Sequence, residues 1–152
     1  MWSTFVNKFK FKNTILDKKE GVVSFENYIN LTGLPLIVFE QNGIKYKFIF
    51  DTGCEISHLH IDSKIDKGIL ENATARSVAV NGDVTICQYA GAILYQGDKE
   101  FKHVFRASDM SKLIANIKKS TGLTIEGLIG SDFMKKYNYC IDYKHLIIYR
   151  LK

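Results

Sequence analysis

The stretch FIFDTGCEISHLH, residues 48–60, places a carboxylate directly after an apolar run. The run Phe48–Phe50 has the composition of a buried strand, whereas the carboxylate of Asp51 is costly to bury without a partner. The residues that follow include a thiol, a serine and two histidines. Three interpretations are open at this point: a catalytic aspartate, a metal-binding cluster, or an ordinary turn.

The segments around this stretch predict a series of β-hairpins. Residues 34–40 and 44–50 are two β-rich runs joined through Asn42-Gly43, a dipeptide that favours a tight primed turn. In the second run, apolar residues alternate with lysines and lead straight into Asp51. Further hairpins are expected over residues 77–89, 91–105 and 138–150. Strand pairs at such regular spacing favour an all-β sandwich or barrel.

Only two segments have the pattern of a helix. The first begins at Ser108, could be capped by Ser108 or Asp109, and ends before Gly122. Its apolar residues have the spacing of a face that packs on a core: Met110, Leu113, Ile114 and Ile117. The second is a short helix from Asp132, with Ser131 as its expected cap.

Composition indicates one globular domain. The chain has 152 residues, of which 46% are hydrophobic and 24% charged, which is enough for one hydrophobic core. We expect residues 1–25, which are Lys-rich, to form a lead-in or arm, and residues 26–152 to form the domain. The formal net charge of +5 is mild and includes no dense Lys/Arg block, so no nucleic-acid partner is expected.

The cysteines and the apolar runs indicate the cellular compartment. Three cysteines, Cys54, Cys87 and Cys140, do not look like a disulfide framework. The first residues lack the apolar core of a secretory signal, and no apolar run reaches the length of a membrane span. We therefore expect a cytoplasmic protein with reduced thiols and no membrane partner.

Two blocks of the sequence together resemble a known family. The first is the hairpin that runs into FIFDTGCEIS, and the second is IEGLIGSDFMKKYNYCIDYKHLIIY, residues 125–149. They resemble the retropepsin-type aspartic proteases, the single-domain, retroviral-like branch of the acid proteases. The resemblance covers approximately residues 30–150 and is greatest to bacterial members with an insertion after the flap.

The resemblance implies a fold and a set of site residues. The fold would be a closed acid-protease barrel with one or two short helices. Asp51 would be catalytic, and its loop would be supported by Thr52, Gly53, Cys54 and Ser57. The hairpin tip at Asn81, Gly82 and Asp83 would be the flap, and Leu128, Ile129 and Gly130 would form an apolar-Gly strand beside the active-site loop.

The chemistry of this family implies a homodimer. Peptide hydrolysis by an acid protease needs two carboxylates that share one proton, because two carboxylates about 3 Å apart cannot both ionise easily. The chain has one Asp-Thr-Gly, and Asp132 lacks the Thr-Gly that would follow a second catalytic aspartate. An active enzyme would therefore join two copies of Asp51 across a twofold axis and hydrolyse peptide or protein substrates with no cofactor.

Several features leave alternatives open. Cys54 stands where the family usually has Ala, Ser or Thr, so it is either a small apolar residue or a redox-sensitive site. A metal site at Cys54, Glu55, His58 and His60 matches no zinc spacing, and no metal is expected. A retropepsin-like scaffold could also be a dimeric peptide-binding module with little turnover, because fold alone does not imply function. The net charge leaves a polyanion-binding accessory domain as a third hypothesis.

Overall fold

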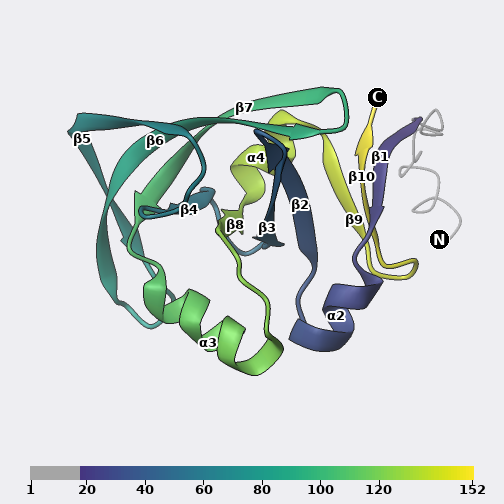
Figure 1. Cartoon of the computed structure of the whole chain (residues 1–152), viewed down its shortest axis with the longest axis horizontal. Coiled ribbons are helices and arrows are strands. Elements are labelled where there is room, and N and C mark those ends of the chain that lie inside the picture. Colours follow the sequence, from purple (N-terminus) through teal and green to yellow (C-terminus); the bar gives the residue numbers. More distant parts are fainter. Residues whose placement is uncertain (1–17) are drawn as a thin grey trace, which may run out of the picture.

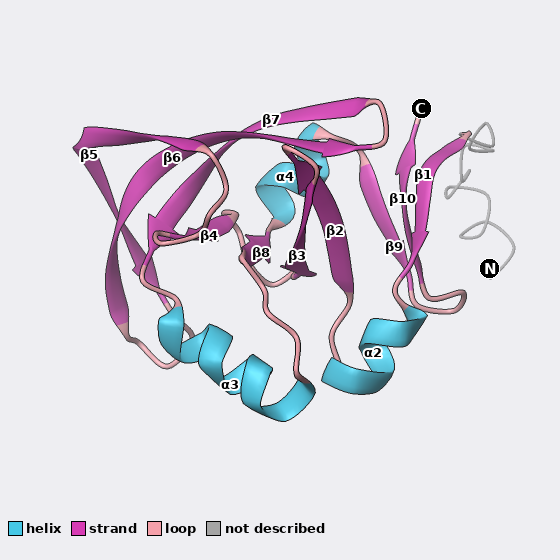
Figure 2. Cartoon of the chain, in the orientation of Figure 1, coloured by secondary structure: helices cyan, strands magenta, loops and turns pink. Residues whose placement is uncertain are grey.

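The computed structural model describes residues 18–152 and shows a mostly β molecule with short helices (Figure 1 and Figure 2). None of the helices in this range is long and apolar enough to cross a membrane. In chain order the elements are β1 (Lys19–Ser24), α2 (Glu26–Thr32), β2 (Leu36–Gln41), β3 (Ile44–Phe50), β4 (His58–His60), β5 (Lys67–Val78), β6 (Val84–Gln96), β7 (Lys99–Ser108), α3 (Ser111–Thr121), β8 (Gly127–Ile129), α4 (Ser131–Lys136), β9 (Tyr139–Asp142) and β10 (Ile147–Leu151).

Six strands close into a barrel. The larger sheet has the order β2-β3-β8-β4-β7-β6-β5, and a pairing of Glu40 with Tyr95 joins β2 back to β6. The barrel therefore consists of β2, β3, β8, β4, β7 and β6, while β5 extends from β6 as the outer arm of a hairpin. This confirms the expected closed all-β barrel. A second sheet, β1-β10-β9, lies beside the barrel (Figure 1).

The hairpin that leads to Asp51 has the turn that its sequence predicts. Asn42 and Gly43 both have positive φ, 52° and 75°, which a primed two-residue turn requires. In β3 the side chains of Tyr46, Phe48 and Phe50 are buried. Ile44 is 52% exposed because it lies at the hairpin end. This turn fixes the register, and the register determines which face of β3 enters the core.

The barrel interior is filled mainly by aromatic side chains. Phe39, Phe48, Phe101, Phe105 and Phe133 are each at most 1% exposed. Phe39 lies edge-on to the rings of Phe48, Phe101 and Phe133, a geometry that adds to the burial of apolar area. The core thus joins the barrel strands to α4, the helix that follows β8.

A smaller apolar cluster lies beneath the other two helices. Leu36, Ile49 and Ile125 are buried there, and Ile114 and Ile117 of α3 pack against them. The apolar face of α3 is therefore core packing, as its spacing predicts.

The longer helix begins three residues later than predicted, and the short helix begins one residue earlier. The longer helix, α3, begins at Ser111, because Ser108 still belongs to β7 and pairs with His60. The carboxylate of Asp109 nevertheless accepts a hydrogen bond from the Ser111 amide at 2.9 Å. Gly122 ends this helix in the left-handed conformation, as predicted.

The short helix α4 includes Ser131 as its first residue, and Gly130 occupies the cap position. Ser131 is therefore not the cap. Its hydroxyl instead donates to the carbonyl oxygen of Glu55, at 3.3 Å.

The sequence pattern does not reveal α2 or the role of β1. Helix α2 is one short segment, ended by Gly33 in the left-handed conformation, and its apolar face is only half buried. Strand β1 lies at the end of the predicted lead-in and pairs with β10. The rest of that lead-in, residues 1–17, lies outside the described residues.

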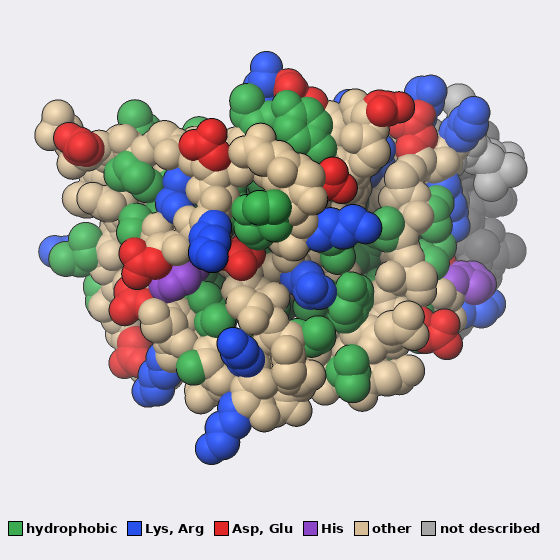
Figure 3. Space-filling view, in the orientation of Figure 1, with side chains coloured by type: hydrophobic (Ala, Val, Ile, Leu, Met, Phe, Trp, Pro, Cys, Tyr) green, Lys and Arg blue, Asp and Glu red, His purple; other side chains and the backbone are tan. Residues whose placement is uncertain are grey.

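Charged side chains are mixed on the face shown in Figure 3. Lys and Arg alternate there with Asp and Glu, and no continuous patch of one sign is visible. This distribution fits the mild formal charge of +5.

Candidate active site

The path of β8 between β3 and β4 organises the site. β8 runs parallel to β3 and antiparallel to β4, so it fills the gap that the Asp51 loop spans. Two glycines permit this close passage. A Cβ on Gly127 would collide with the His58 carbonyl oxygen, and one on Gly130 would lie 2.6 Å from the Cys54 carbonyl oxygen. The predicted element Leu128-Ile129-Gly130 therefore passes beside the loop.

Asp51 is held at the end of β3 by backbone contacts. Its amide donates to the Ile129 carbonyl oxygen at 3.0 Å. Its Oδ1 accepts from the Gly53 amide at 2.9 Å, and its carbonyl oxygen accepts from the Cys54 amide at 3.2 Å. Asp51 is half-buried, whereas Thr52 and Gly53 are exposed. The carboxylate thus has a fixed orientation at a surface that a second molecule can reach.

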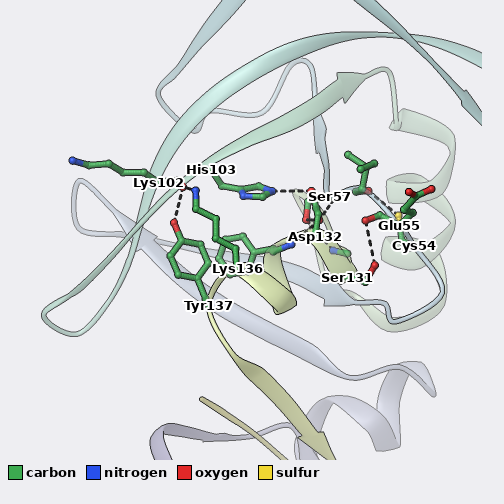
Figure 4. Close-up of polar contacts among 12 residues, drawn as sticks. Cys54, Glu55, Ser57, Lys102, His103, Ser131, Asp132, Lys136 and Tyr137 are labelled. Carbon is green, nitrogen blue, oxygen red and sulfur yellow. Dashed lines mark hydrogen bonds and ion pairs between the residues drawn. The ribbon is translucent and has the colours of Figure 1, made fainter. Parts of the chain in front are cut away.

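The far end of the loop is fastened to α4 (Figure 4). The amides of Ser131 and Asp132 donate to the carbonyl oxygens of Cys54 and Glu55, at 2.8 and 3.1 Å. Ser57 is fully buried, and its hydroxyl accepts from the Gly130 amide at 2.9 Å. These contacts hold the loop at both ends, so its conformation follows from the barrel.

Asp132 and Ser57 form the centre of the hydrogen-bond network that holds the loop against α4. Asp132 Oδ1 accepts from the Ser57 amide at 2.9 Å, the Ser57 hydroxyl at 2.7 Å and the Phe133 amide at 2.7 Å. Burial acts to raise the pKa of Asp132, but the hydrogen bonds from Ser57 and Phe133, together with His103, outweigh it, so the pKa is lowered overall. Asp132 is therefore ionised at neutral pH.

His103 completes the group, and no motif of the sequence marks it as part of the site. Its Nε2 lies 3.0 Å from Asp132 Oδ2. An ionised carboxylate only accepts, so Nε2 carries the hydrogen. Burial lowers the pKa of His103, although the charge of Asp132 acts in the opposite direction. The signal that could find it is the alternation of β7, which places His103 on the same inward face as Phe101 and Phe105.

The Asp51 loop lines a cavity of about 970 Å³. The cavity lies between this loop, the β5–β6 hairpin, the end of β7 and α3. Asp51, Gly53 and Cys54 line it from the loop, and Arg76 to Val80 with Thr85 line it from the hairpin. A cleft of this size accommodates several residues of an extended peptide.

The predicted flap residues form the tip of that hairpin. Asn81 Nδ2 donates to the Asp83 carboxylate at 2.8 Å, and Gly82 has a φ of 88°. None of Asn81, Gly82 and Asp83 is among the residues that line the cavity. The structure therefore places the cavity-facing part of the hairpin in its two strands, next to the predicted tip.

Cys54 lies in the loop with its thiol directed at the backbone. Its Sγ lies 2.9 Å from the carbonyl oxygen of Ile56. Burial raises the pKa of this thiol, and the negative charge of Asp51 raises it further. The thiol therefore stays protonated at neutral pH, where it is a weak nucleophile.

The two histidines of β4 have separate partners. His60 Nδ1 accepts from the Met110 amide at 3.1 Å, and His58 Nε2 lies 3.5 Å from the Ser77 hydroxyl. Within residues 18–152 no group of three or more His, Cys, Asp or Glu side chains is placed to hold a metal ion.

Comparison with known proteins gives no matching family model and no significant match among curated proteins.

Proposed function

We propose that the chain has a retropepsin-like fold and acts as a homodimeric aspartic endopeptidase. The observation that carries the proposal is the Asp51 loop. It is clamped by β8, which passes between β3 and β4, and it opens into a cavity beneath a long hairpin. A rigid carboxylate at the floor of a covered cleft is what general acid–base hydrolysis of a peptide requires.

The proposed chemistry needs Asp51 from two copies of the chain. One carboxylate takes a proton from a water molecule, whose oxygen attacks the carbonyl carbon of the scissile peptide bond. The other, protonated carboxyl donates its proton to the carbonyl oxygen. The tetrahedral intermediate then collapses: the C–N bond breaks, the leaving nitrogen receives the proton that the first carboxylate took from water, and the other carboxylate takes the proton of the intermediate's hydroxyl as the carbonyl re-forms. The Gly53 amide, which donates to Asp51 Oδ1, fixes which carboxylate oxygen faces the water.

The structure argues against a dyad within one chain. Asp132 lies within the second block, but both of its oxygens are engaged. Oδ1 accepts three hydrogen bonds and Oδ2 faces His103. A carboxylate engaged in this way is poorly placed to exchange protons with a substrate, which supports a second carboxylate supplied by Asp51 of a second copy.

Two surfaces support assembly and substrate binding. Strand β9 pairs only with β10 within residues 18–152, so its other edge is open. The hairpin strands carry exposed apolar side chains, with Val78 66% and Ile86 71% exposed. Exposed apolar residues beside a cleft are typical of a surface that contacts a peptide or another subunit.

A peptide library tests the proposal. Purified wild-type protein and the Asp51→Asn variant are incubated with a diverse peptide library from pH 4 to pH 8. The control variant is Asp62→Asn, because the Asp62 side chain is exposed and makes no hydrogen bond within the described residues. We expect cleavage by the wild type and by Asp62→Asn, and none by Asp51→Asn. Cleavage that persists in Asp51→Asn would remove Asp51 from the catalytic role, and binding of peptides without cleavage would favour the peptide-binding module.

A further inference from the structure

The cavity wall beside Asp51 carries two arginines. Arg106 lies in β7 and Arg76 lies in β5, and both line the cavity. The Arg106 amide donates to the Ser57 carbonyl oxygen at 3.0 Å, and Arg106 is the register partner of His58 in β4. The backbone of Arg106 is therefore fixed to the same frame as the Asp51 loop.

The Arg106 guanidinium has unused donors. Its Nη1 donates to the Arg76 carbonyl oxygen at 3.1 Å. Its Nε is buried and finds no acceptor among residues 18–152. Within the same residues, the side chains of Arg106 and Arg76 have no carboxylate within ion-pair distance. Because Nε is buried, a ligand in the cavity would reach this guanidinium through its Nη atoms. A positive charge without a carboxylate partner suits this wall to an anionic ligand.

Three carboxylates line the same cavity, those of Asp51, Glu55 and Asp109, and within residues 18–152 none forms an ion pair with these arginines. Asp109 accepts from the Ser111 amide, and Asp51 accepts from the Gly53 amide. Glu55 is exposed on the loop. Lys112 on α3 adds a further positive charge to the lining. His58 lies in the strand next to Arg106. Its burial and the charge of Arg106 lower its pKa, so His58 is neutral at pH 7.

We propose that the wall formed by Arg106 and Arg76 is a subsite for an acidic side chain, so that preferred peptides carry Asp or Glu at one position near the scissile bond. The inference rests on the proposed peptide-cleaving function and names the substrate class of that site. The guanidinium fork matches a carboxylate in two parallel hydrogen bonds. Apolar residues of the same cavity, Leu113, Leu128 and Val78, would contact the flanking side chains of the peptide.

Two measurements separate this inference from the proposed function. The first is cleavage-site profiling of the wild type with a random peptide library. The second is affinity selection of the same library on immobilised Asp51→Asn, which does not require turnover. Both are repeated with Arg106→Gln and Arg106→Glu, and with Lys102→Gln as the matched control, because the Lys102 side chain is 68% exposed and lies outside the cavity.

We expect enrichment of Asp and Glu at one position in the wild type and in Lys102→Gln. The enrichment should fall roughly tenfold in Arg106→Gln, because a charge-assisted hydrogen bond is lost, and should shift to Lys or Arg in Arg106→Glu. If the wild type cleaved peptides without a preference for Asp or Glu at any position, the inference would be overturned and the proposed function would stand. Acidic selection on Asp51→Asn without cleavage by the wild type would support the subsite and reject the protease. Displacement of bound peptide by a single-stranded oligonucleotide at equal concentration would assign the wall to nucleic acid and overturn the inference.

Discussion

At the scale of single residues, the fastening of the Asp51 loop depends on Asp132. Its carboxylate accepts the amide and hydroxyl of the buried Ser57 and also faces His103. We predict that Asp132→Ala lowers the free energy of unfolding by roughly 2–4 kcal/mol, because two buried donors lose their acceptor. Urea denaturation measures the change. The matched control Asp62→Ala, at an exposed position, should stay within about 0.5 kcal/mol of the wild type.

If Asp132→Ala and Asp62→Ala proved equally stable, the fastening would contribute nothing to the fold, and the fixed geometry of the loop would need another cause.

His103 gives the fold a pH dependence of defined sign. Burial lowers the pKa of His103 below its ordinary value of about 6.5. The unfolded chain therefore binds more protons at this residue than the folded chain, and stability falls as pH drops below about 6.5. We predict a shallower fall between pH 7.5 and 5.5 in His103→Gln, measured by urea midpoints at each pH. Some dependence should remain, because burial also lowers the pKa of His58.

An unchanged slope in His103→Gln would mean that His103 is protonated to the same extent in both states, contrary to its buried position. At lower pH a second loss is expected. The pKa of Asp132 is below its ordinary value of about 3.8, so the stability that it contributes is lost as pH falls below that value.

At the scale of elements, the passage of β8 between β3 and β4 demands glycine. A Cβ on Gly127 would overlap the backbone of His58, whereas a Cβ on Gly91 in β6 would meet nothing within 4 Å. We predict that Gly127→Ala costs about 3 kcal/mol or more, since backbone cannot move aside without breaking the pairing of β8. Gly91→Ala should cost less than about 1 kcal/mol. Thermal unfolding of the two variants makes the comparison.

Equal melting temperatures for Gly127→Ala and Gly91→Ala would show that β8 does not lie as close to β4 as described, and would remove the frame on which the Asp51 site is built.

The elements also show what the sequence can predict. Local patterns are sufficient for the hairpin turn at Asn42-Gly43, the strand alternation of β3 and the apolar face of α3, because each depends on neighbours in the chain. The start of α3 is predicted too early, because Ser108 is held in β7 by its pairing with His60. Helix α2 is missed, because it is too short to display a period and Phe25, which cannot cap through its side chain, stands at its cap position.

The sequence predicts some residues of the candidate site and misses others. Asp51 and the apolar-Gly strand come from two sequence blocks, and the structure brings them together. The partnership of Ser57, Asp132 and His103 joins residues 75 and 29 positions apart, and no local pattern encodes contacts at that separation. Arg76 and Arg106 are missed for the same reason, since they meet only where β5 and β7 form the walls of one cavity.

At the scale of the whole molecule, the proposal requires two chains for one active site. Within residues 18–152, Asp51 accepts one side-chain hydrogen bond, from the Gly53 amide. Asp132 accepts three at Oδ1 and faces His103 with Oδ2. Activity should therefore belong to the dimer and not to the subunit. Dilution below the dimerisation constant should lower the activity per subunit.

The most direct test of this claim is a mixing experiment. Wild type and Asp51→Asn are denatured, combined in equal amounts and refolded together, and cleavage of one peptide substrate is measured per wild-type subunit against wild type refolded alone. If each site needs Asp51 from both chains, random pairing leaves only about half of the wild-type subunits in active dimers, so the activity per wild-type subunit falls to about one half. Activity per wild-type subunit that is unchanged by the variant would show that each chain works alone, and would contradict the account.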